Sequence, residues 1–192
     1  FSWAYDGWRQ KTWNRAIGEG HSDYATEVKW SAGAVIGCLL DLDEGQISFS
    51  LNGDVLGVAF TNVTSQLAAA MRDEGALGIC PAATFTAGRH ELRFSEQECE
   101  FTPAGYQHYV QPTNAFTLRN DRVDDCSQYP ELAPDGTPNT TVVTVAREAD
   151  APDQSDCVIR AEYPLVGLAV GEQFDSTASG YFEATIVAEG DD

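Results

Sequence analysis

The amino-acid sequence predicts an all-β chain built from short antiparallel strands. Residues 37–60 give the clearest evidence, because apolar runs alternate there with turn residues that include glycine. Within this stretch Ile47, Phe49 and Leu51 alternate with polar residues, as in a strand with one buried face. The whole chain offers about eleven to thirteen strand-like segments, which is enough for one closed sandwich of two sheets.

The central stretch is expected to form a three-stranded meander. Its first two strands, residues 38–42 and 47–51, flank Asp43-Glu44-Gly45, whose glycine permits the positive φ of a short hairpin. Asn52-Gly53 then leads into residues 55–60, and this pair is a strong hairpin signal. The acidic residues of the first turn are interpreted as hairpin residues, because the further oxygen ligands of a calcium loop are missing.

The first thirteen residues are rich in aromatic side chains and are expected to form a strand end followed by a loop. Trp3 is interpreted as a core residue. Four residues near Gly7 are interpreted as loop residues, for which a binding role and a structural role both stay open. They are Tyr5, Asp6, Trp8 and Arg9.

The following segment, residues 14–29, shows no clear periodicity and is expected to be a long surface loop. His21 lies in it among acidic residues and is interpreted as a solvated loop histidine, because the spacing supplies no second metal ligand. Trp30 is expected to open the next strand. Residues 66–72 contain strong helix formers and favour a short helix at one end of the sheets.

The second half of the chain is less regular. Residues 79–85 and 90–94 alternate as strands and are joined by a glycine-containing loop. Residues 107–155 are linker-like in composition, with one good strand at residues 140–146, and are expected to lie along the sandwich. Residues 180–187 alternate like a half-buried strand.

Several phrases of the sequence carry a family resemblance. They are Ser-Trp-Ala-Tyr-Asp-Gly at residues 2–7, the phrase at residues 30–37, the meander wording at residues 36–60, Cys80-Pro81-Ala82, the strand at residues 91–94 and Phe-Thr-Pro-Ala-Gly-Tyr at residues 101–106. Together they resemble the B30.2/SPRY domain, an interaction module found in ryanodine receptors, ubiquitin ligases and adaptor proteins. The sequence departs from the family pattern at Ala4 and Ala34, and it lacks the family's N-F-G phrase after Phe94.

The resemblance implies an all-β, two-sheet antiparallel sandwich of the SPRY or concanavalin-like jelly-roll type. Family order is inverted, because residues 180–187 resemble an early SPRY strand although they stand near the end of this chain. The chain is therefore expected to be either circularly permuted or cut across two tandem repeats. Residues 1–106 would be the C-terminal two-thirds of the sandwich, residues 107–155 a connecting segment, and residues 156–192 the opening strands. We expect the last segment to complete the same sandwich, because an exposed sheet edge invites aggregation.

The composition restricts the classes of partner. The net charge is -19 at pH 7, and the acidic excess is concentrated in the second half of the chain. Such a surface repels phosphate backbones and anionic lipids, so neither nucleic acid nor membrane insertion is expected. The chain begins at Phe1 and its only methionine is Met71, so a fragment, a processed product and a chain with a missing start are all compatible with it.

Five cysteines lack the spacing of a zinc site, and we expect a reducing, cytoplasmic compartment and no metal. Cys38 lies in an apolar run and is interpreted as a small buried residue. Asn62 and Asn139 begin formal glycosylation sequons, which matter only in a secreted chain.

No nucleophile-elbow, zincin, phosphate-loop or dinucleotide motif occurs in the sequence, so neither catalysis nor a cofactor is expected. The resemblance implies a protein or peptide partner held by loops at one end of the sandwich. The expected partner-binding residues are Tyr5, Asp6 and Gly7, which match the family phrase, and Trp8 and Arg9, which follow from the loop argument. Two alternatives stay open. One is a scaffold module that packs against neighbouring domains of a large intracellular protein, and the other is a lectin-like carbohydrate-binding sandwich.

Overall fold

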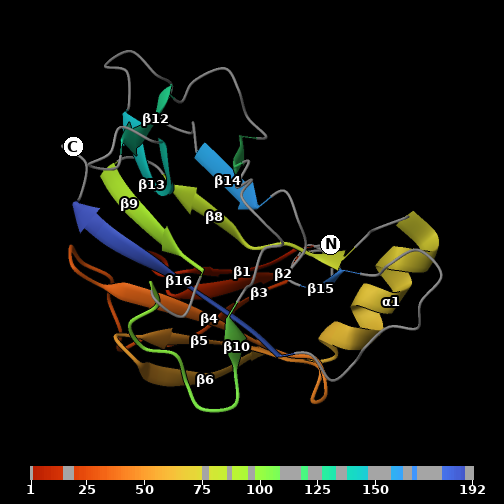
Figure 1. The fold of residues 1–192 in the computed structure, drawn as a ribbon. Helices are drawn as coiled ribbons and strands as arrows, with labels where there is room; N and C mark the ends of the chain where they lie inside the picture. Colours follow the sequence, from red (N-terminus) through yellow and green to blue (C-terminus); the bar gives the residue numbers. More distant parts are fainter. Residues whose placement is uncertain are drawn as a thin grey trace.

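The computed structural model describes residues 2–14, 20–74, 78–85, 88–94, 98–108, 118–120, 127–132, 138–146, 157–161, 166–167 and 179–188. In this part of the chain the fold is mostly β, with one helix, and nearly all neighbouring strands are antiparallel (Figure 1). The predicted all-β sandwich is confirmed.

The elements follow one another in this order. The first strands are β1 (Trp3–Asp6), β2 (Lys11–Asn14), β3 (Gly20–Asp23), β4 (Val35–Asp41), β5 (Gln46–Leu51) and β6 (Asp54–Phe60), followed by helix α1 (Val63–Glu74). Next come β7 (Gly78–Ile79), β8 (Ala82–Phe85), β9 (Gly88–Arg93), β10 (Gln107–His108), β11 (Leu118–Asn120) and β12 (Ser127–Leu132). The last strands are β13 (Pro138–Ala146), β14 (Cys157–Ala161), β15 (Val166–Gly167) and β16 (Ser179–Ala188).

The largest sheet has the strand order β12-β13-β9-β16-β4-β5-β6, and β10 pairs with β16 in parallel. Strands β1, β2 and β3 form a second sheet, β11, β14 and β8 a third, and β15 and β7 a two-stranded ladder. The predicted meander is confirmed as β4-β5-β6. Its turns have the expected geometry, with positive φ at Gly45 (62°), Asn52 (49°) and Gly53 (89°).

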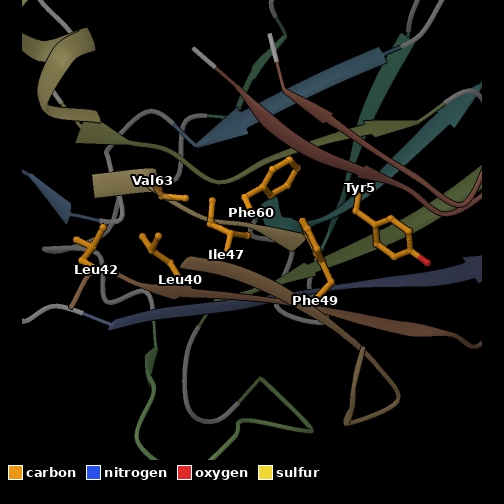
Figure 2. Packing of buried hydrophobic residues seen from close by; sticks show 7 residues of the cluster. All are labelled: Tyr5, Leu40, Leu42, Ile47, Phe49, Phe60 and Val63. Carbon is orange, nitrogen blue, oxygen red and sulfur yellow. The ribbon is translucent and has the colours of Figure 1, made fainter. Parts of the chain in front are cut away.

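A hydrophobic core lies against the meander (Figure 2). Its buried residues are Tyr5, Leu40, Leu42, Ile47, Phe49, Phe60 and Val63. They come from β1, from β4 and the turn after it, from β5 and β6, and from the start of α1, so the core joins the β1-β2-β3 sheet, the meander and the helix. Trp3 packs against this cluster as expected, and its indole N–H donates a hydrogen bond to Gln66 Oε1 at 3.1 Å.

Strand β16 lies in the middle of the largest sheet although it is the last strand of the chain (Figure 1). On one side it pairs with β4, in a register that runs from Ser179↔Asp41 to Thr185↔Val35. On the other side it pairs with β9, where Glu183 stands opposite Arg93. The C-terminal strand and the meander therefore belong to one hydrogen-bonded sheet.

Three predictions about elements are wrong in their bounds. Residues 20–23 were expected in a loop but form β3, because Lys11 pairs with Asp23 at 3.0 Å and Trp13 stacks on His21 across the ladder. Trp30 precedes the strand that it was expected to open, since β4 begins at Val35. The predicted strand at residues 79–85 is divided into β7 and β8.

Other elements agree with the predictions or extend them. The expected helix is present and is longer than residues 66–72. The strand expected at residues 140–146 is β13, and the linker-like segment also contains β11 and β12. Only parts of residues 107–155 are among the described residues, so most of the expected path along the sandwich lies outside them.

Candidate functional site

The predicted binding residues lie at and beside the turn that joins β1 and β2. This turn comprises residues 7–10 and lies at the end of the β1-β2-β3 sheet. Asp6 accepts a hydrogen bond from the Arg9 backbone N–H at 2.9 Å and from Arg9 Nη1 at 2.8 Å. The aspartate therefore closes the turn through its side chain and holds the guanidinium at the tip.

The far side of the turn is attached to the segment that follows β3. Gln10 has a φ of 55°, its side-chain amide donates to Val28 O at 2.8 Å, and its carbonyl accepts from Tyr24 N at 2.9 Å. A residue with positive φ is retained where surrounding contacts fix it. The turn is thus held at both ends, by Asp6 and by Gln10.

Trp8 is the most exposed large apolar residue of the described chain, with 91% of its surface accessible to solvent. It stands at the tip of the turn, between the buried Gly7 and the exposed Arg9. An exposed tryptophan beside an oriented arginine is the residue combination that dominates many protein-recognition surfaces. The turn therefore offers a large apolar ring whose position is set by a hydrogen-bonded backbone.

Tyr5 and Asp6 were expected in the loop, and this prediction is wrong because both lie in β1, Tyr5 with its ring in the core. Its ring meets those of Tyr24, Trp30 and Phe49 at centroid distances of 5.0, 5.1 and 5.2 Å. Burial raises the pKa of its hydroxyl, and the neighbouring Trp30 indole partly offsets this rise, although neither polar atom makes a hydrogen bond of standard geometry among the described residues. Tyr5 supports the turn from the core side, whereas Asp6, Trp8 and Arg9 form its outer surface.

Gly7 is also a supporting residue. It is buried, and a Cβ atom placed on it would overlap the indole ring of Trp30. The ring of Trp30 in turn packs edge-on against Tyr5. The glycine in the Tyr-Asp-Gly phrase is therefore required because an aromatic ring lies directly on the backbone at this position.

We expect Gly7→Ala to lower the free energy of unfolding by about 1–3 kcal/mol, because the added methyl group must displace the Trp30 indole. Urea denaturation followed by tryptophan fluorescence measures the change. Gly33→Ala serves as a comparison for glycine replacement in open space, although its φ of 85° adds backbone strain. An unchanged unfolding midpoint for Gly7→Ala would contradict the packing described above.

The outer face of the β1-β2-β3 sheet carries a second group of side chains, which the sequence did not indicate as binding residues. Trp13 is 42% exposed and stacks on His21 at 5.0 Å, two residue pairs along the ladder from the ion pair of Lys11 with Asp23. Hydrophobic alternation could not have found it, because in Lys11–Asn14 the polar Thr12 and Asn14 are buried and Trp13 is exposed, the reverse of the usual pattern. His21 is held in this stack and is not a loop residue.

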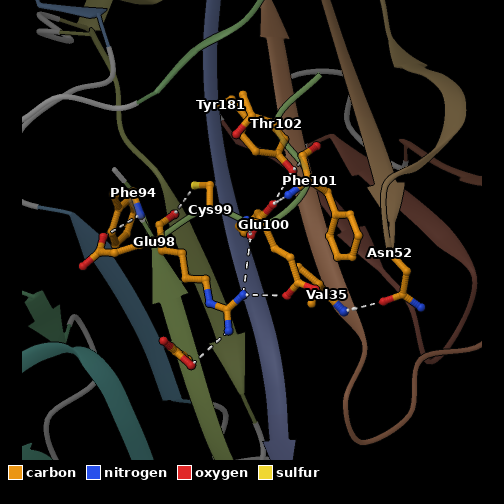
Figure 3. A network of polar contacts seen from close by, with 12 residues as sticks. Val35, Asn52, Phe94, Glu98, Cys99, Glu100, Phe101, Thr102 and Tyr181 are labelled. Carbon is orange, nitrogen blue, oxygen red and sulfur yellow. Dashed lines mark hydrogen bonds and ion pairs between the residues drawn. The ribbon is translucent and has the colours of Figure 1, made fainter. Parts of the chain in front are cut away.

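A buried polar network holds β16 to the segment that crosses it (Figure 3). Glu183 is fully buried and accepts hydrogen bonds from the backbone N–H groups of Glu100 and Phe101 at 2.8 and 2.7 Å. It also accepts from the Tyr181 hydroxyl at 2.8 Å and faces Arg93 Nη1 at 3.8 Å. These donors replace the water that a carboxylate loses on burial, so the network is structural.

The described residues offer little that resembles a catalytic centre. Burial raises the pKa of the Cys38 and Cys99 thiols to about 12, so both are protonated and poorly nucleophilic at neutral pH. Asp41 accepts a hydrogen bond from Glu44 N at 2.9 Å, which explains the acidic turn as a capped hairpin. Among these residues there is also no group of His, Cys, Asp or Glu that could hold a metal ion.

The same part of the chain contains no helix with both the length and the apolar character needed to cross a membrane.

Comparison with known proteins gives a family for this arrangement. Residues 1–73 match the family model of the SPRY domain. Among curated proteins, the chain is similar to the E3 ubiquitin-protein ligase RKP of Arabidopsis thaliana, with 33% identity over 122 residues. The match covers 62% of this chain and 8% of that protein, so the chain spans a small part of the length of its relative. No solved structure was found to match.

The family match covers β1 to β6 and most of α1, and therefore includes the meander and the β1–β2 turn. SPRY domains are in general protein-interaction modules and are not catalytic. This confirms the resemblance identified in the sequence. Residues 1–73 are thus the part of the chain that is similar to SPRY domains.

Proposed function

We propose that this chain recognises a short segment of a partner protein through the β1–β2 turn, without catalysis. Trp8 would bury its ring against the partner, while Asp6 and Arg9 would orient the segment through charged hydrogen bonds. Tyr5 and Gly7 belong to the same site as its supports. The observation that carries the proposal is the exposure of Trp8 on a turn that is fixed at both ends.

The turn is a better binding surface than the exposed valines of β6. A fixed loop loses little conformational entropy on binding, so more of the contact energy appears as affinity. Val55 and Val58 are also exposed, but each is smaller than a tryptophan, and neither has an arginine beside it in the sequence. Aromatic and arginine anchors contribute most of the affinity in many interfaces.

We also propose that residues 156–192 complete the same sandwich as residues 1–106, so that the chain is a circularly permuted SPRY unit. The pairing of β16 with both β4 and β9 supports this organisation. A cytoplasmic location is part of the proposal, and the free thiols at Cys38 and Cys99 are compatible with a reducing compartment. The partner is a protein or peptide, either a separate chain or a neighbouring domain.

The test is Trp8→Ala, which should lose more than ~1 kcal/mol of binding free energy while leaving stability within about 0.5 kcal/mol. The partner is first identified as a protein that the parent chain retains from a cell lysate. Titration calorimetry with that partner then measures the affinity of the variant. Urea denaturation measures the stability of both chains.

Val55→Ala is the matched control, because it removes an exposed apolar side chain on β6, away from the turn. It should bind like the parent. If Trp8→Ala also binds like the parent, the turn is not the recognition surface, and the scaffold role becomes the better account of this domain.

A further inference from the structure

The outer face of the β1-β2-β3 sheet carries an aromatic ring that is covered on one side only. Ala4, Trp13 and His21 stand opposite one another on the three strands, in the registers Ala4↔Trp13 and Trp13↔His21. Side chains of a strand stand roughly perpendicular to the sheet, and directly opposed residues lie about 5 Å apart. The His21 ring lies nearly parallel to the Trp13 indole, at a centroid distance of 5.0 Å and an interplanar angle of 24°. His21 therefore covers the face of the indole that is turned toward β3.

The other face of the indole is turned toward β1, where the opposed residue is too small to cover it. Ala4 supplies only a methyl group and is itself exposed. An exposure of 42% for Trp13 agrees with an indole that is covered on one face. A position for a flat group therefore lies above Ala4, against the open face of Trp13.

A carboxylate borders this position, and the nearest ammonium group is directed away from it. Asp6 lies two residues along β1 from Ala4, so both side chains belong to the outer face of the sheet. Lys11 stands opposite Asp6 on β2, but its ammonium group binds Asp23 of β3 at 3.0 Å and is held on that side. Arg9 contacts Asp6 from the turn at 2.8 Å, and a carboxylate can accept further hydrogen bonds beside this one. The position above Ala4 thus lies between an aromatic face and a carboxylate.

We propose that the position bounded by Ala4, Asp6 and Trp13 is a binding site for an arginine side chain of a basic protein segment. The face of an aromatic ring attracts cations, and tryptophan does so most strongly. A guanidinium group is planar, so it can stack on the indole while it donates hydrogen bonds to a carboxylate at its edge.

The charge of the chain decides between the possible occupants. With a net charge of -19, the molecule attracts cationic segments and repels anionic ones. An aromatic side chain could stack in the same place, but it would gain nothing from Asp6 or from the net charge. Lysine carries the charge without the flat shape, so arginine is the side chain that fits both the indole and the carboxylate.

This arginine site is distinct from the tip of the β1–β2 turn. Trp8 stands at the tip, whereas Trp13 lies within β2 on the face of the sheet. The site does not require Trp8, so it is tested independently of recognition by the turn.

The experiment titrates the whole chain with the peptide acetyl-Gly-Arg-Gly-amide and records the indole N–H signals by NMR at constant ionic strength. The signal of Trp13 is assigned from its absence in Trp13→Leu. The same peptide with lysine in place of arginine tests the need for a planar group. A citrulline peptide, which keeps the shape of arginine without its charge, tests the need for the cation. We expect the Trp13 signal to shift with the arginine peptide, to shift less with the lysine peptide and to stay in place with the citrulline peptide.

Ala4→Leu is the decisive variant, because the larger side chain occupies the position against the open face of Trp13 and leaves the indole itself in place. It should weaken binding of the arginine peptide by about 2- to 5-fold, which is the contribution expected of an exposed cation–π contact. Ala68→Leu, at an exposed alanine of α1, is the matched control and should bind like the parent. The proposal is overturned if Ala4→Leu binds like the parent, or if the citrulline peptide shifts the Trp13 signal as far as the arginine peptide does.

Trp8→Ala should leave the response of the Trp13 signal to the arginine peptide unchanged. If Trp8→Ala abolishes this response, the arginine binds at the turn and the proposed site is wrong. Failure of the turn as a recognition surface is therefore distinguishable from failure of the arginine site.

Discussion

Glu183→Ala is expected to lower the free energy of unfolding by about 3–5 kcal/mol. The substitution leaves the N–H groups of Glu100 and Phe101 and the Tyr181 hydroxyl without their acceptor, and it leaves Arg93 facing an empty position. A buried donor that loses its acceptor loses the hydrogen bond and still lacks hydration by water. Urea denaturation monitored by circular dichroism measures the change.

Two further variants distinguish the loss of the network's hydrogen bonds from a general effect of removing a carboxylate. Glu183→Gln keeps one acceptor oxygen and the side-chain shape, so its loss should be smaller than that of Glu183→Ala. Glu44→Ala removes an exposed carboxylate from a turn and should stay within about 0.5 kcal/mol of the parent. A cost below about 1 kcal/mol for Glu183→Ala would show that the 98–106 segment does not depend on β16.

Tyr5→Ala is expected to cost about 3–5 kcal/mol of stability, as for other large aromatic side chains removed from a core. Its ring touches three other aromatic rings, and the resulting cavity would lie beneath the β1–β2 turn. Binding of the partner should therefore be lost together with the fold. Thermal unfolding and partner binding are measured on the same preparation.

Tyr5→Phe is the decisive companion, because the Tyr5 hydroxyl has no hydrogen-bond partner in the described part of the chain. We expect it to change stability by less than about 1 kcal/mol and to leave partner binding intact. Loss of binding by a stable Tyr5→Phe would instead mean that the hydroxyl meets the partner directly.

The local features of this fold could be predicted from the sequence because a few neighbouring residues determine them. Asn52 and Gly53 both adopt positive φ, and Asn52 Oδ1 also accepts a hydrogen bond from Val35 N at 2.9 Å. Ile47 and Phe49 are buried in β5 as their alternation predicts, although Ser50 is buried as well and Leu51 is only half-buried. Turn chemistry and a period of two are properties of the chain itself, so they hold before any tertiary contact forms.

The features that sequence reasoning missed depend on contacts between distant segments. Glu183 was expected on the polar face of a half-buried strand, yet it is fully buried because residues 98–106 cover that face. Tyr5 stands beside an Asp-Gly pair typical of turns, and only the packing of Trp30 and Phe49 shows that its ring points into the core. Of the five predicted binding residues, Asp6, Trp8 and Arg9 lie together on the outer surface of the turn, and Tyr5 and Gly7 lie beneath it.

The position of β16 also determines the order in which the molecule can be completed. Ile36 and Ala184 stand side by side in the sheet although almost the whole chain separates them in sequence. Contacts of such long sequence separation form slowly, because a large loop must close before any of them is gained. During synthesis, which proceeds from the N-terminus at roughly 5–20 residues per second, β4 and β9 emerge long before their shared neighbour exists. The largest sheet therefore stays open until β16 has been made, and in that interval the unpaired edges of β4 and β9 are the part of the sheet most in need of protection from aggregation.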